Sequence, residues 1–318
     1  MADTETQAAT SSTPASPPRP ASPPPPPAAA AEVRVPDRPT AAAGRRAPER
    51  TRDPVVARAV NDDAVADFRR AHPGQLAPVV VVIPAYNEEP TVAKVVGSVP
   101  RHLAGLAVQV LVVDDGSADS TTAQAAGAGA LVATLRANTG QGNAFKVAYR
   151  IACEGGARYV ATADADGQFD PAELDTMVAL LAEDRADLVN GSRRLGVAHT
   201  DDALRALGVV VFGRLISVLT GARVTDPANG LRAMKAEVAA AVDLRQMQYQ
   251  SSELLICAIA NGFRVRETPV TMHKRHEGTS KKGGNLTYGW RFTKVVLSTW
   301  WRMLAVARQN LPAHQGLW

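Results

Sequence analysis

The stretch Tyr159-Val-Ala-Thr-Ala-Asp-Ala-Asp-Gly-Gln-Phe-Asp-Pro171 carries the pattern that decides the fold. Its first five residues form an apolar run of the length of a buried strand. Asp164 and Asp166 follow, and in an extended segment residues two apart face the same side. Asp170-Pro171 then suits the start of a helix. We therefore predict a strand, two convergent carboxylates and a helix in succession, although an acidic turn with a helix cap would fit the same residues.

Two convergent carboxylates at a strand end are suited to a divalent cation. Mg²⁺ and Mn²⁺ prefer oxygen ligands, and Mg²⁺ typically sits on one or two carboxylates together with substrate phosphates. Asp164 and Asp166 are the candidate metal ligands, with the Gln168 carbonyl continuing the row. This is the arrangement that an enzyme needs to hold a nucleoside diphosphate.

The chain around this stretch alternates between short apolar runs and helical patterns. Such alternation is typical of a parallel sheet covered by helices on both faces. The predicted strands are 79–83, 108–113, 130–135, 159–163 and 187–190, and the predicted helices are 88–99, 121–126, 141–153 and 172–183. Ligands of such sheets bind beyond the carboxyl ends of the strands. The polar motifs 84–88, 114–117 and 164–166 all fall there, which indicates a nucleotide-type site.

The motifs also exclude two common nucleotide sites. The turn after the first strand reads Pro84-Ala-Tyr-Asn-Glu, without the glycines of a dinucleotide fingerprint. The segment Gly140-Gln-Gly-Asn-Ala-Phe-Lys146 lacks the spacing of a Walker lysine loop. Phosphate binding must then depend on a metal and basic side chains, which favours sugar transfer from a nucleotide donor over hydride transfer.

The first 75 residues differ in composition from the rest of the 318-residue chain. Pro, Ala, Ser and Thr dominate them without apolar periodicity, so we predict a disordered tail over 1–75. The acidic opening argues against a signal peptide. Cys153 and Cys257 provide no disulfide framework, and no uncharged apolar run is long enough to span a membrane.

Charge is distributed unevenly along the chain. Residues 76–263 contain 15 Lys/Arg and 20 Asp/Glu, a net charge of −5, whereas residues 264–308 contain 10 and 2, a net charge of +8. A basic block beside an acidic body suggests an anionic partner, namely phosphate, a membrane surface or nucleic acid, although a solvated basic face remains an alternative.

An ordered series of motifs over residues 79–284 resembles the family 2 glycosyltransferases, in particular the dolichyl-phosphate (polyprenyl-phosphate) mannosyltransferase group. The motifs are Ile-Pro-Ala-Tyr-Asn-Glu (83–88), Val-Asp-Asp-Gly-Ser-Ala-Asp (113–119), Asn-Thr-Gly-Gln-Gly-Asn-Ala (138–144), Asp-Ala-Asp-Gly-Gln-Phe-Asp-Pro (164–171), Gly-Ser-Arg (191–193), Asp-Pro-Ala-Asn-Gly-Leu-Arg (226–232), Glu-Thr-Pro-Val (267–270) and Arg-His-Glu-Gly-Thr-Ser-Lys (275–281). The resemblance implies a GT-A-type, Rossmann-like α/β fold over 76–273, a nucleotide-sugar donor and a divalent cation.

The resemblance also assigns roles to residues of the donor site. It implies that the donor base and ribose lie among Pro84, Tyr86, Glu88, Val113 and Asp115, and that the metal and diphosphate are held by Asp164, Ala165, Asp166 and Gln168. A tyrosine ring offers a face to a base, and a carboxylate can accept a hydrogen bond from a ribose hydroxyl. Arg193 follows an apolar strand, where its guanidinium could hold a phosphate through two hydrogen bonds.

The basic segment 274–284 helps to distinguish a phosphate acceptor from a hydroxyl acceptor. A phosphate monoester already carries a charge of about −1.5 to −2 at neutral pH, so it can attack without a general base and needs cations instead. The resemblance implies that Arg275 and Lys281 lie in the active site. An acceptor hydroxyl would instead need a base, for which Asp226, His273 and His276 are candidates. Asp226 could equally cap a turn or orient basic groups.

Residues 285–308 predict an amphipathic helix. Its apolar arc contains Phe292, Val296, Leu297, Trp300, Met303 and Leu304, opposite Arg291, Lys294 and Arg302. Such a helix either packs on the domain or lies in a membrane interface with its apolar arc down. The pair Trp300-Trp301 and the basic block favour the membrane, which predicts a cytoplasmic protein bound peripherally to the cytoplasmic face of the cell membrane.

The most specific prediction is an inverting, metal-dependent transfer of mannose from GDP-mannose to a polyprenyl phosphate. Its catalytic residues would be Asp166, Arg193, Arg275, Lys281 and Asp226, and its cofactor Mg²⁺ or Mn²⁺. One alternative is a soluble glycosyltransferase that uses UDP-glucose or another nucleotide sugar, with a hydroxyl acceptor and Asp226 or a histidine as base. The other is a non-catalytic protein that binds a nucleotide sugar or nucleic acid. A nucleic-acid partner is disfavoured because no aromatic residues interleave the basic residues of 274–284.

Overall fold

The computed structural model describes residues 53–199, 203–273 and 285–310, all of them in one compact unit, Arg46–Trp318. Its strands are β1 (Val79–Ala85), β2 (His102–Leu103), β3 (Leu106–Asp114), β4 (Leu131–Thr134), β5 (Tyr159–Thr162), β6 (Leu188–Ala198), β7 (Arg232–Lys235) and β8 (Val265–Met272). Its helices are α1 (Pro54–Ala71), α2 (Val92–Ser98), α3 (Thr121–Gly127), α4 (Gln141–Glu154), the 3₁₀ helix η1 (Pro171–Glu173), α5 (Leu174–Ala182), α6 (Ala203–Thr220), α7 (Ala236–Ala241), α8 (Gln250–Ala260) and α9 (Asn285–Asn310).

The strands form one mixed sheet in the order β2-β3-β1-β5-β7-β6-β8, and β4 also pairs with β3. The pairs β1/β3, β1/β5, β3/β4 and β6/β8 are parallel, whereas β7 runs antiparallel to both β5 and β6. The five predicted strands are present, and the predicted α/β architecture, a Rossmann-like sheet flanked by helices, is confirmed. Sequence analysis missed β7 because its four residues, Arg-Ala-Met-Lys, show neither alternation nor an apolar run.

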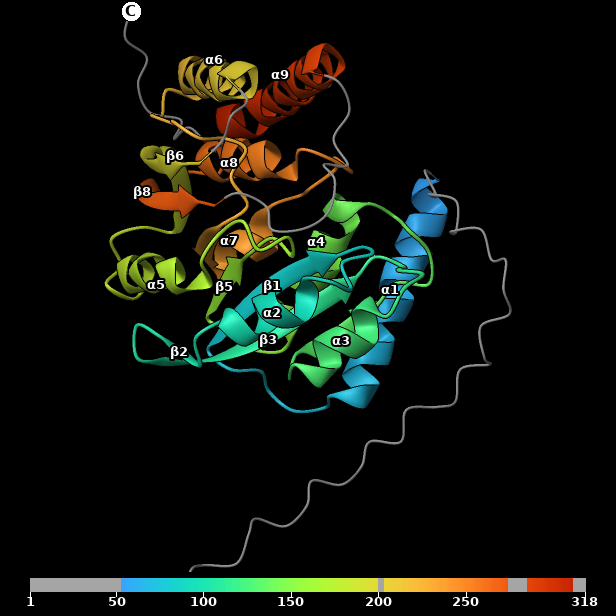
Figure 1. Ribbon diagram of the computed structural model, residues 1–318. Coiled ribbons are helices and arrows are strands. Elements are labelled where there is room, and N and C mark those ends of the chain that lie inside the picture. Colours follow the sequence, from blue (N-terminus) through green and yellow to red (C-terminus); the bar gives the residue numbers. More distant parts are fainter. Residues whose placement is uncertain (1–52, 200–202, 274–284, 311–318) are drawn as a thin grey trace, which may run out of the picture. The chain divides into compact units, whose positions relative to one another are not determined.

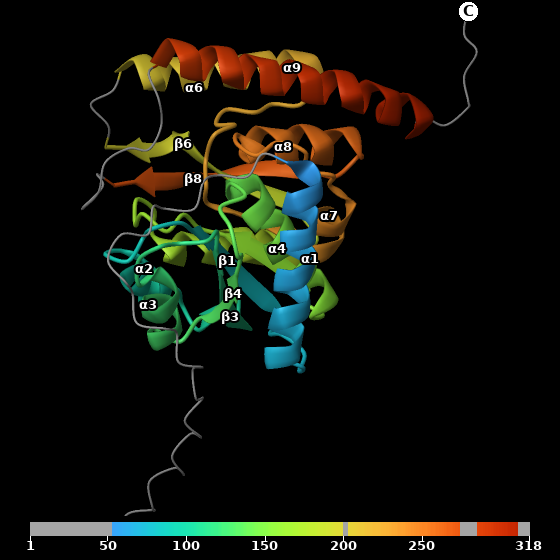
Figure 2. The same cartoon turned by 90° about the vertical axis from the view of Figure 1, so that its right-hand side faces the viewer.

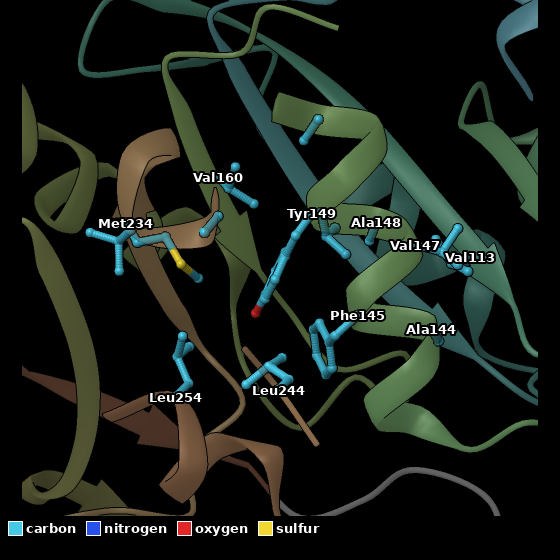
Figure 3. Close-up of a cluster of buried hydrophobic side chains, with 14 of the residues drawn as sticks. Val113, Ala144, Phe145, Val147, Ala148, Tyr149, Val160, Met234, Leu244 and Leu254 are labelled. Carbon is cyan, nitrogen blue, oxygen red and sulfur yellow. The ribbon is translucent and has the colours of Figure 1, made fainter. Parts of the chain in front are cut away.

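Helices cover both faces of the sheet, as Figures 1 and 2 show. In β1 the side chains alternate between two cores: Val80 and Val82 face the core beneath α4 and α8, and Val79, Val81 and Ile83 face the core beneath α2 and α5. Figure 3 shows the first core, where Phe145 and Tyr149 of α4 lie among aliphatic side chains. All seven residues of β1 are buried, as expected for a central parallel strand.

The prediction of a disordered tail over 1–75 is wrong for residues 54–71, which form α1. Asp53 caps this helix by accepting a hydrogen bond from Val55 N at 2.9 Å, and Pro54 occupies its first turn. Ala57, Ala64, Val65 and Phe68 are buried at helical spacing, and α1 lies along α4 in both views of the fold (Figures 1 and 2). Sequence analysis did not recognise Asp53-Pro54 as the start of a helix, because many other prolines precede this pair. Residues 1–52 lie outside the described residues.

The predicted C-terminal helix is present as α9, but its apolar arc faces inward. Phe292, Val296 and Met303 are buried in the core beneath α4 and α8, and Trp300 packs against that core. Much of the arc therefore packs on the protein, whereas Leu297 is exposed, and the peripheral membrane location stays a prediction. No helix in the described ranges has the length and apolarity needed to cross a bilayer.

A buried carboxylate of α8 forms an ion pair that holds α9 against the domain. Glu253 of α8 is fully buried, and its Oε1 accepts from Arg302 Nη2 at 2.7 Å. Its carboxylate also accepts from the backbone N–H groups of Arg245 and Gln246 at 2.8–3.0 Å. The partner of Glu253 is Arg302, on the polar side of α9.

We predict that Glu253→Ala lowers the free energy of unfolding by about 3–5 kcal/mol, because it leaves the Arg302 guanidinium and two backbone donors without their acceptor. Urea denaturation measures the change. Glu183→Ala removes a carboxylate from an exposed ion pair with Arg185 and should change the free energy of unfolding by less than about 1 kcal/mol. Equal effects of the two substitutions would contradict this account of the pair between α8 and α9.

Candidate functional site

Three polar loops meet at one edge of the sheet. The register pairs Ala85 with Asp114 and Val82 with Thr162, so β1, β3 and β5 end at the same edge. Backbone hydrogen bonds continue this alignment beyond the strands, from Asp115 N to Ala85 O at 2.8 Å and from Ala163 N to Val82 O at 3.0 Å. The motifs that sequence analysis placed at strand ends therefore lie side by side.

The loops after β1 and β3 hold each other in place. Asn87 N donates to Ser117 Oγ at 2.9 Å, Glu88 N donates to Thr121 Oγ1 at 2.9 Å, and Ala118 N donates to Asn87 Oδ1 at 2.9 Å. Asn87 adopts a φ of 51°, a left-handed conformation that asparagine tolerates better than most residues. These bonds fix the backbone of the segment that carries Tyr86 and Glu88.

The five residues predicted around the donor base and ribose differ in their exposure to solvent. Tyr86 and Glu88 are partly exposed, whereas Pro84, Val113 and Asp115 are buried beneath them. The Asp115 carboxylate accepts from Thr139 N at 2.7 Å, from Thr139 Oγ1 at 3.0 Å and from Gly140 N at 2.8 Å. Asp115 therefore has a structural task that was not foreseen, since it fixes the turn that precedes α4. The contact of these residues with a nucleotide stays a prediction.

The burial of residues 163–166 alternates, although the chain turns at 165–167. Ala163 and Ala165 are buried, whereas Asp164 and Asp166 are partly exposed on the opposite side. Asp166 Oδ1 accepts from Gln168 N at 3.1 Å across Gly167, whose φ of 69° suits glycine. Both aspartates are thus partly exposed just beyond β5, and their convergence on one cation stays a prediction.

Gln168 joins this segment to the end of β8. Its carbonyl accepts from His273 N at 2.8 Å, and its side-chain Nε2 donates to His273 O at 3.3 Å. Phe169 forms an isolated bridge with Met272 next to this contact. Gln168 thus anchors the chain where it enters 274–284, and its role as a metal ligand stays a prediction. Arg275, His276 and Lys281 lie outside the described residues.

The loop between α6 and β7 packs directly on Asp164. A Cβ at Gly230 would come within 2.0 Å of Asp164 Oδ2, so any side chain there would displace the carboxylate. Gly230 O accepts from Thr162 Oγ1 at 2.7 Å, and Asn229 O accepts from Arg232 Nη2. The loop is therefore held against the end of β5 from both sides. Gly230 is a site residue that sequence analysis quoted but did not use.

A buried ion pair closes the other end of this loop. Arg193 of β6 donates to Asp226 through Nε to Oδ2 at 2.6 Å, Nη2 to Oδ1 at 2.7 Å and its backbone N to Oδ2 at 3.0 Å. Asp226 has no exposed surface. Burial alone would raise the pKa of Asp226, but the hydrogen bonds and charge of Arg193 outweigh it and hold the pKa below its usual value. An ionised, enclosed carboxylate of this kind is a poor general base.

This pair bears on the predicted roles of Arg193 and Asp226, and for Asp226 it favours the alternative of orienting a basic group. The guanidinium edge that was expected to hold a phosphate bidentately is occupied by Asp226, so Arg193 orders the loop. Asp226, a candidate base for a hydroxyl acceptor, instead orients that arginine. Arg193 Nη1 also donates to Met272 Sδ at 3.6 Å, which brings Arg193 to the end of β8. Any contact between Arg193 and substrate would be made from this anchored position.

Two further residues of the site were not predicted. Glu267 of β8 accepts hydrogen bonds from Thr225 N, Thr225 Oγ1 and Asp226 N at 2.7–3.1 Å, so it holds the loop that contains Asp226. Glu267 is the first residue of the Glu-Thr-Pro-Val motif, so the sequence already contained a pointer to it. Arg232 is buried, and burial lowers the pKa of its guanidinium, opposed by the charges of Asp164 and Asp226. Its Nε has no hydrogen-bond partner among the described residues.

The donor set of this edge fits a divalent cation that shares its ligands with a substrate. Within the described parts of the chain, no three His, Cys, Asp or Glu residues are grouped so that they could hold a metal ion alone. Asp164 and Asp166 supply two partly exposed carboxylates beyond the end of β5, and one or two carboxylates are the protein contribution typical of a Mg²⁺ site completed by phosphates.

Comparison with known proteins gives the family. The model of "Glycosyl transferase family 2" matches residues 80–242. Polyprenol monophosphomannose synthase of Mycolicibacterium smegmatis is 31% identical over 65% of this chain and 81% of its own length. Dolichyl-phosphate hexose transferase of Haloferax volcanii is 31% identical over 68% of this chain and 93% of its own. Undecaprenyl-phosphate mannosyltransferase of Micrococcus luteus is 29% identical over 75% and 99%.

Solved structures give the fold independently. Glucosyl-3-phosphoglycerate synthase from Mycobacterium tuberculosis, in complex with Mn²⁺, UDP and phosphoglyceric acid, superposes with a TM-score of 0.57 at 20% identity and covers 74% of this chain and 82% of its own. The same enzyme has also been solved with Mg²⁺ and UDP. The resemblance that the sequence motifs indicated is confirmed by the family model and by the named relatives. The chain is a glycosyltransferase and belongs to glycosyl transferase family 2.

Proposed function

We propose that this glycosyltransferase transfers mannose from GDP-mannose to the phosphate of a polyprenyl phosphate, with inversion and with Mg²⁺ or Mn²⁺ as cofactor. The observation that carries the proposal is the edge at which Asp164 and Asp166 emerge together, with Gly230 packed against Asp164. The relatives named for transfer to polyprenyl, dolichyl and undecaprenyl phosphates support the acceptor, and two of their names support mannose.

The donor would lie along the edge formed by the loops after β1, β3 and β5. Tyr86 and Glu88, on a backbone fixed by Asn87, would receive the base and ribose, and Asp164 and Asp166 would hold the cation. When bound, the cation supplies positive charge to the leaving nucleoside diphosphate. Arg232, which is buried, would add its positive charge close to Asp164.

The acceptor would be the nucleophile itself. A phosphate oxygen of the lipid attacks the anomeric carbon from the face opposite the departing diphosphate, and the configuration inverts. Because the phosphate monoester is already anionic, the protein has no proton to remove. The enclosed Asp226–Arg193 pair is consistent with this, since Asp226 is not available as a base. Arg275 and Lys281 would hold the acceptor phosphate.

Transfer of radiolabelled sugar into a butanol-extractable lipid tests the proposal directly. The purified protein is supplied with polyprenyl phosphate or with the parent polyprenol, and with GDP-mannose, UDP-glucose or other nucleotide sugars. We expect label in the lipid only with the phosphate and mainly from GDP-mannose. Transfer from UDP-glucose would correct the donor alone, whereas efficient glycosylation of a neutral alcohol with the phosphate ignored would overturn the acceptor.

We predict that Asp166→Ala lowers transfer at least 100-fold while the protein remains folded, because the side chain emerges outside the core. Asp166→Asn should also be severe, since the substitution removes the charge of the ligand. Steady-state kinetics across a Mn²⁺ titration, with circular dichroism for folding, measures both. Glu237→Ala, which removes an exposed carboxylate of α7, is the matched control and should retain wild-type transfer. Wild-type turnover of Asp166→Ala in chelator would contradict the metal assignment.

Gly230→Ala should also lower transfer strongly, since its methyl group would overlap the Asp164 carboxylate. Gly97→Ala is the control, because no atom lies within 4 Å of the Cβ position at Gly97 in α2. We expect Gly230→Ala to weaken Mn²⁺-dependent nucleotide binding in isothermal titration calorimetry, and Gly97→Ala to leave it unchanged. Unaltered binding and transfer in Gly230→Ala would show that the position of Asp164 is not critical.

Arg275→Ala and Lys281→Ala should each lower transfer at least tenfold and weaken nucleotide-sugar binding less. The reason is that these cations are assigned to the acceptor phosphate and not to the donor. The readouts are the KM for polyprenyl phosphate and the Kd for the nucleotide sugar. Arg101→Ala, an exposed cation elsewhere on the domain, is the control. Loss of donor binding with an unchanged KM for the acceptor would reverse the assignment.

A further inference from the structure

Gln168 and Glu173 cover the outer edge of β8. This strand is the last in the order of the sheet, and the N–H groups on the outer edge of such a strand need acceptors from elsewhere. Thr271 N donates to the Glu173 carboxylate, at 2.9 Å to Oε1 and 3.2 Å to Oε2, and His273 N donates to Gln168 O at 2.8 Å. Pro269, two residues before Thr271, has no N–H group to satisfy. The stretch of chain that runs from Gln168 to Glu173 is therefore attached to β8 at both of its ends.

The chain between these two attachments also packs on β8. Phe169 forms an isolated antiparallel bridge with Met272, and Phe169 and Val270 belong to the same core, beneath α2 and α5. Asp170 caps the short helix η1, which carries Glu173. The stretch is thus held on the strand by backbone pairing, by apolar packing and by the contact of one carboxylate.

This attachment reaches one of the aspartates that are proposed to bind the cation. Asp166 Oδ1 accepts from Gln168 N at 3.1 Å, so the position of Gln168 sets the orientation of that carboxylate. Gln168 is itself fixed by two bonds to the backbone of His273, one from its carbonyl and one from its side chain. Metal ligands are oriented by the groups that support them, and loss of such a group typically weakens the site. Loosening of the stretch should therefore be felt at Asp166.

We propose that Glu173 is a positioning residue of the transfer site. Its hydrogen bond with Thr271 N keeps the stretch 168–173 on β8, and Gln168 then holds the Asp166 carboxylate in the orientation that binds the divalent cation. Glu173 acts through Gln168 and contacts neither the cation nor the substrate. The inference rests on the proposed function, because it takes Asp166 as a ligand of the metal.

Asp175 provides a matched control for a carboxylate with a purely structural task. It lies two residues after Glu173, in the first turn of α5, and its Oδ1 accepts from Ala104 N at 2.7 Å. Asp175 therefore holds the turn between β2 and β3, whereas Glu173 holds β8. Both carboxylates accept from a backbone N–H far away in the sequence, but only the contact of Glu173 is linked to Asp166.

A Mn²⁺ titration of transfer tests the proposal. Glu173→Ala should raise the Mn²⁺ concentration for half-maximal transfer by about 10- to 100-fold, the range typical of groups that orient metal ligands. Glu173→Gln should restore most of the wild-type value, because its amide oxygen can still accept from Thr271 N. Thr271→Pro removes the donor instead of the acceptor and should repeat the effect of Glu173→Ala, which also provides the comparison if Glu173→Ala does not fold. Asp175→Ala should lower the melting temperature, as Glu173→Ala does, and leave the Mn²⁺ dependence unchanged.

Amide hydrogen exchange separates failure of this inference from failure of the proposed function, because it needs neither metal nor substrate. In Glu173→Ala the amides of 168–170 and of 271–273 should exchange faster than in the wild type, and in Asp175→Ala they should not. Unchanged exchange at 168–170, an unchanged Mn²⁺ dependence in Glu173→Ala and Thr271→Pro, or an equal shift in Asp175→Ala would overturn the positioning role. Wild-type transfer that needs no divalent cation would refute the proposed metal dependence, and faster exchange in Glu173→Ala would then confine Glu173 to a structural role.

Discussion

The buried ion pair between Arg193 and Asp226 is the constraint on which the site depends. It joins β6 to the loop before β7, and that loop passes over the end of β5. A buried charge is costly unless it is fully paired, and here the arginine fork, a backbone N–H and the neighbouring Glu267 leave neither residue without partners. The pair therefore favours one position of the loop, and the position of Gly230 against Asp164 follows from it.

Most charged residues of the site hold loops in place, whereas two aspartates are proposed to bind the cation. Asp115, Asp226, Glu267 and Arg193 hold loops by hydrogen bonds to backbone or to one another. Asp164 and Asp166 emerge from the supported edge with partial exposure. Arg232, buried near both Asp164 and Asp226, contributes its charge from behind. Several charged residues of the motifs thus maintain the geometry of the loops from which the two aspartates project.

Much of the fold and the location of the site could be predicted from the sequence. Apolar runs such as Val79–Ile83 indicate strands, and the run before Asp164 and Asp166 indicates that both aspartates lie just beyond the end of a strand. The spacing could not indicate which residue each charged side chain would pair with. Arg193 meets Asp226 only because β6 and the loop before β7 come together in the sheet, 33 residues apart in sequence. Likewise, the apolar arc of α9 could face either protein or lipid, and only the positions of α6 and α8 decide that it faces inward. Helix α1 was missed because its Asp53-Pro54 start resembles the proline-rich sequence before it.

The central claim is that the edge formed by Asp164 and Asp166 holds the diphosphate of a nucleotide sugar through a divalent cation. The most direct measurement is anomalous diffraction from crystals soaked with Mn²⁺ and GDP. The account predicts one strong manganese peak within bonding distance of an Asp166 oxygen and of the diphosphate, with the Asp164 carboxylate still packed against Gly230. GDP bound at another surface, or at this edge with manganese bonded to neither aspartate, would contradict it.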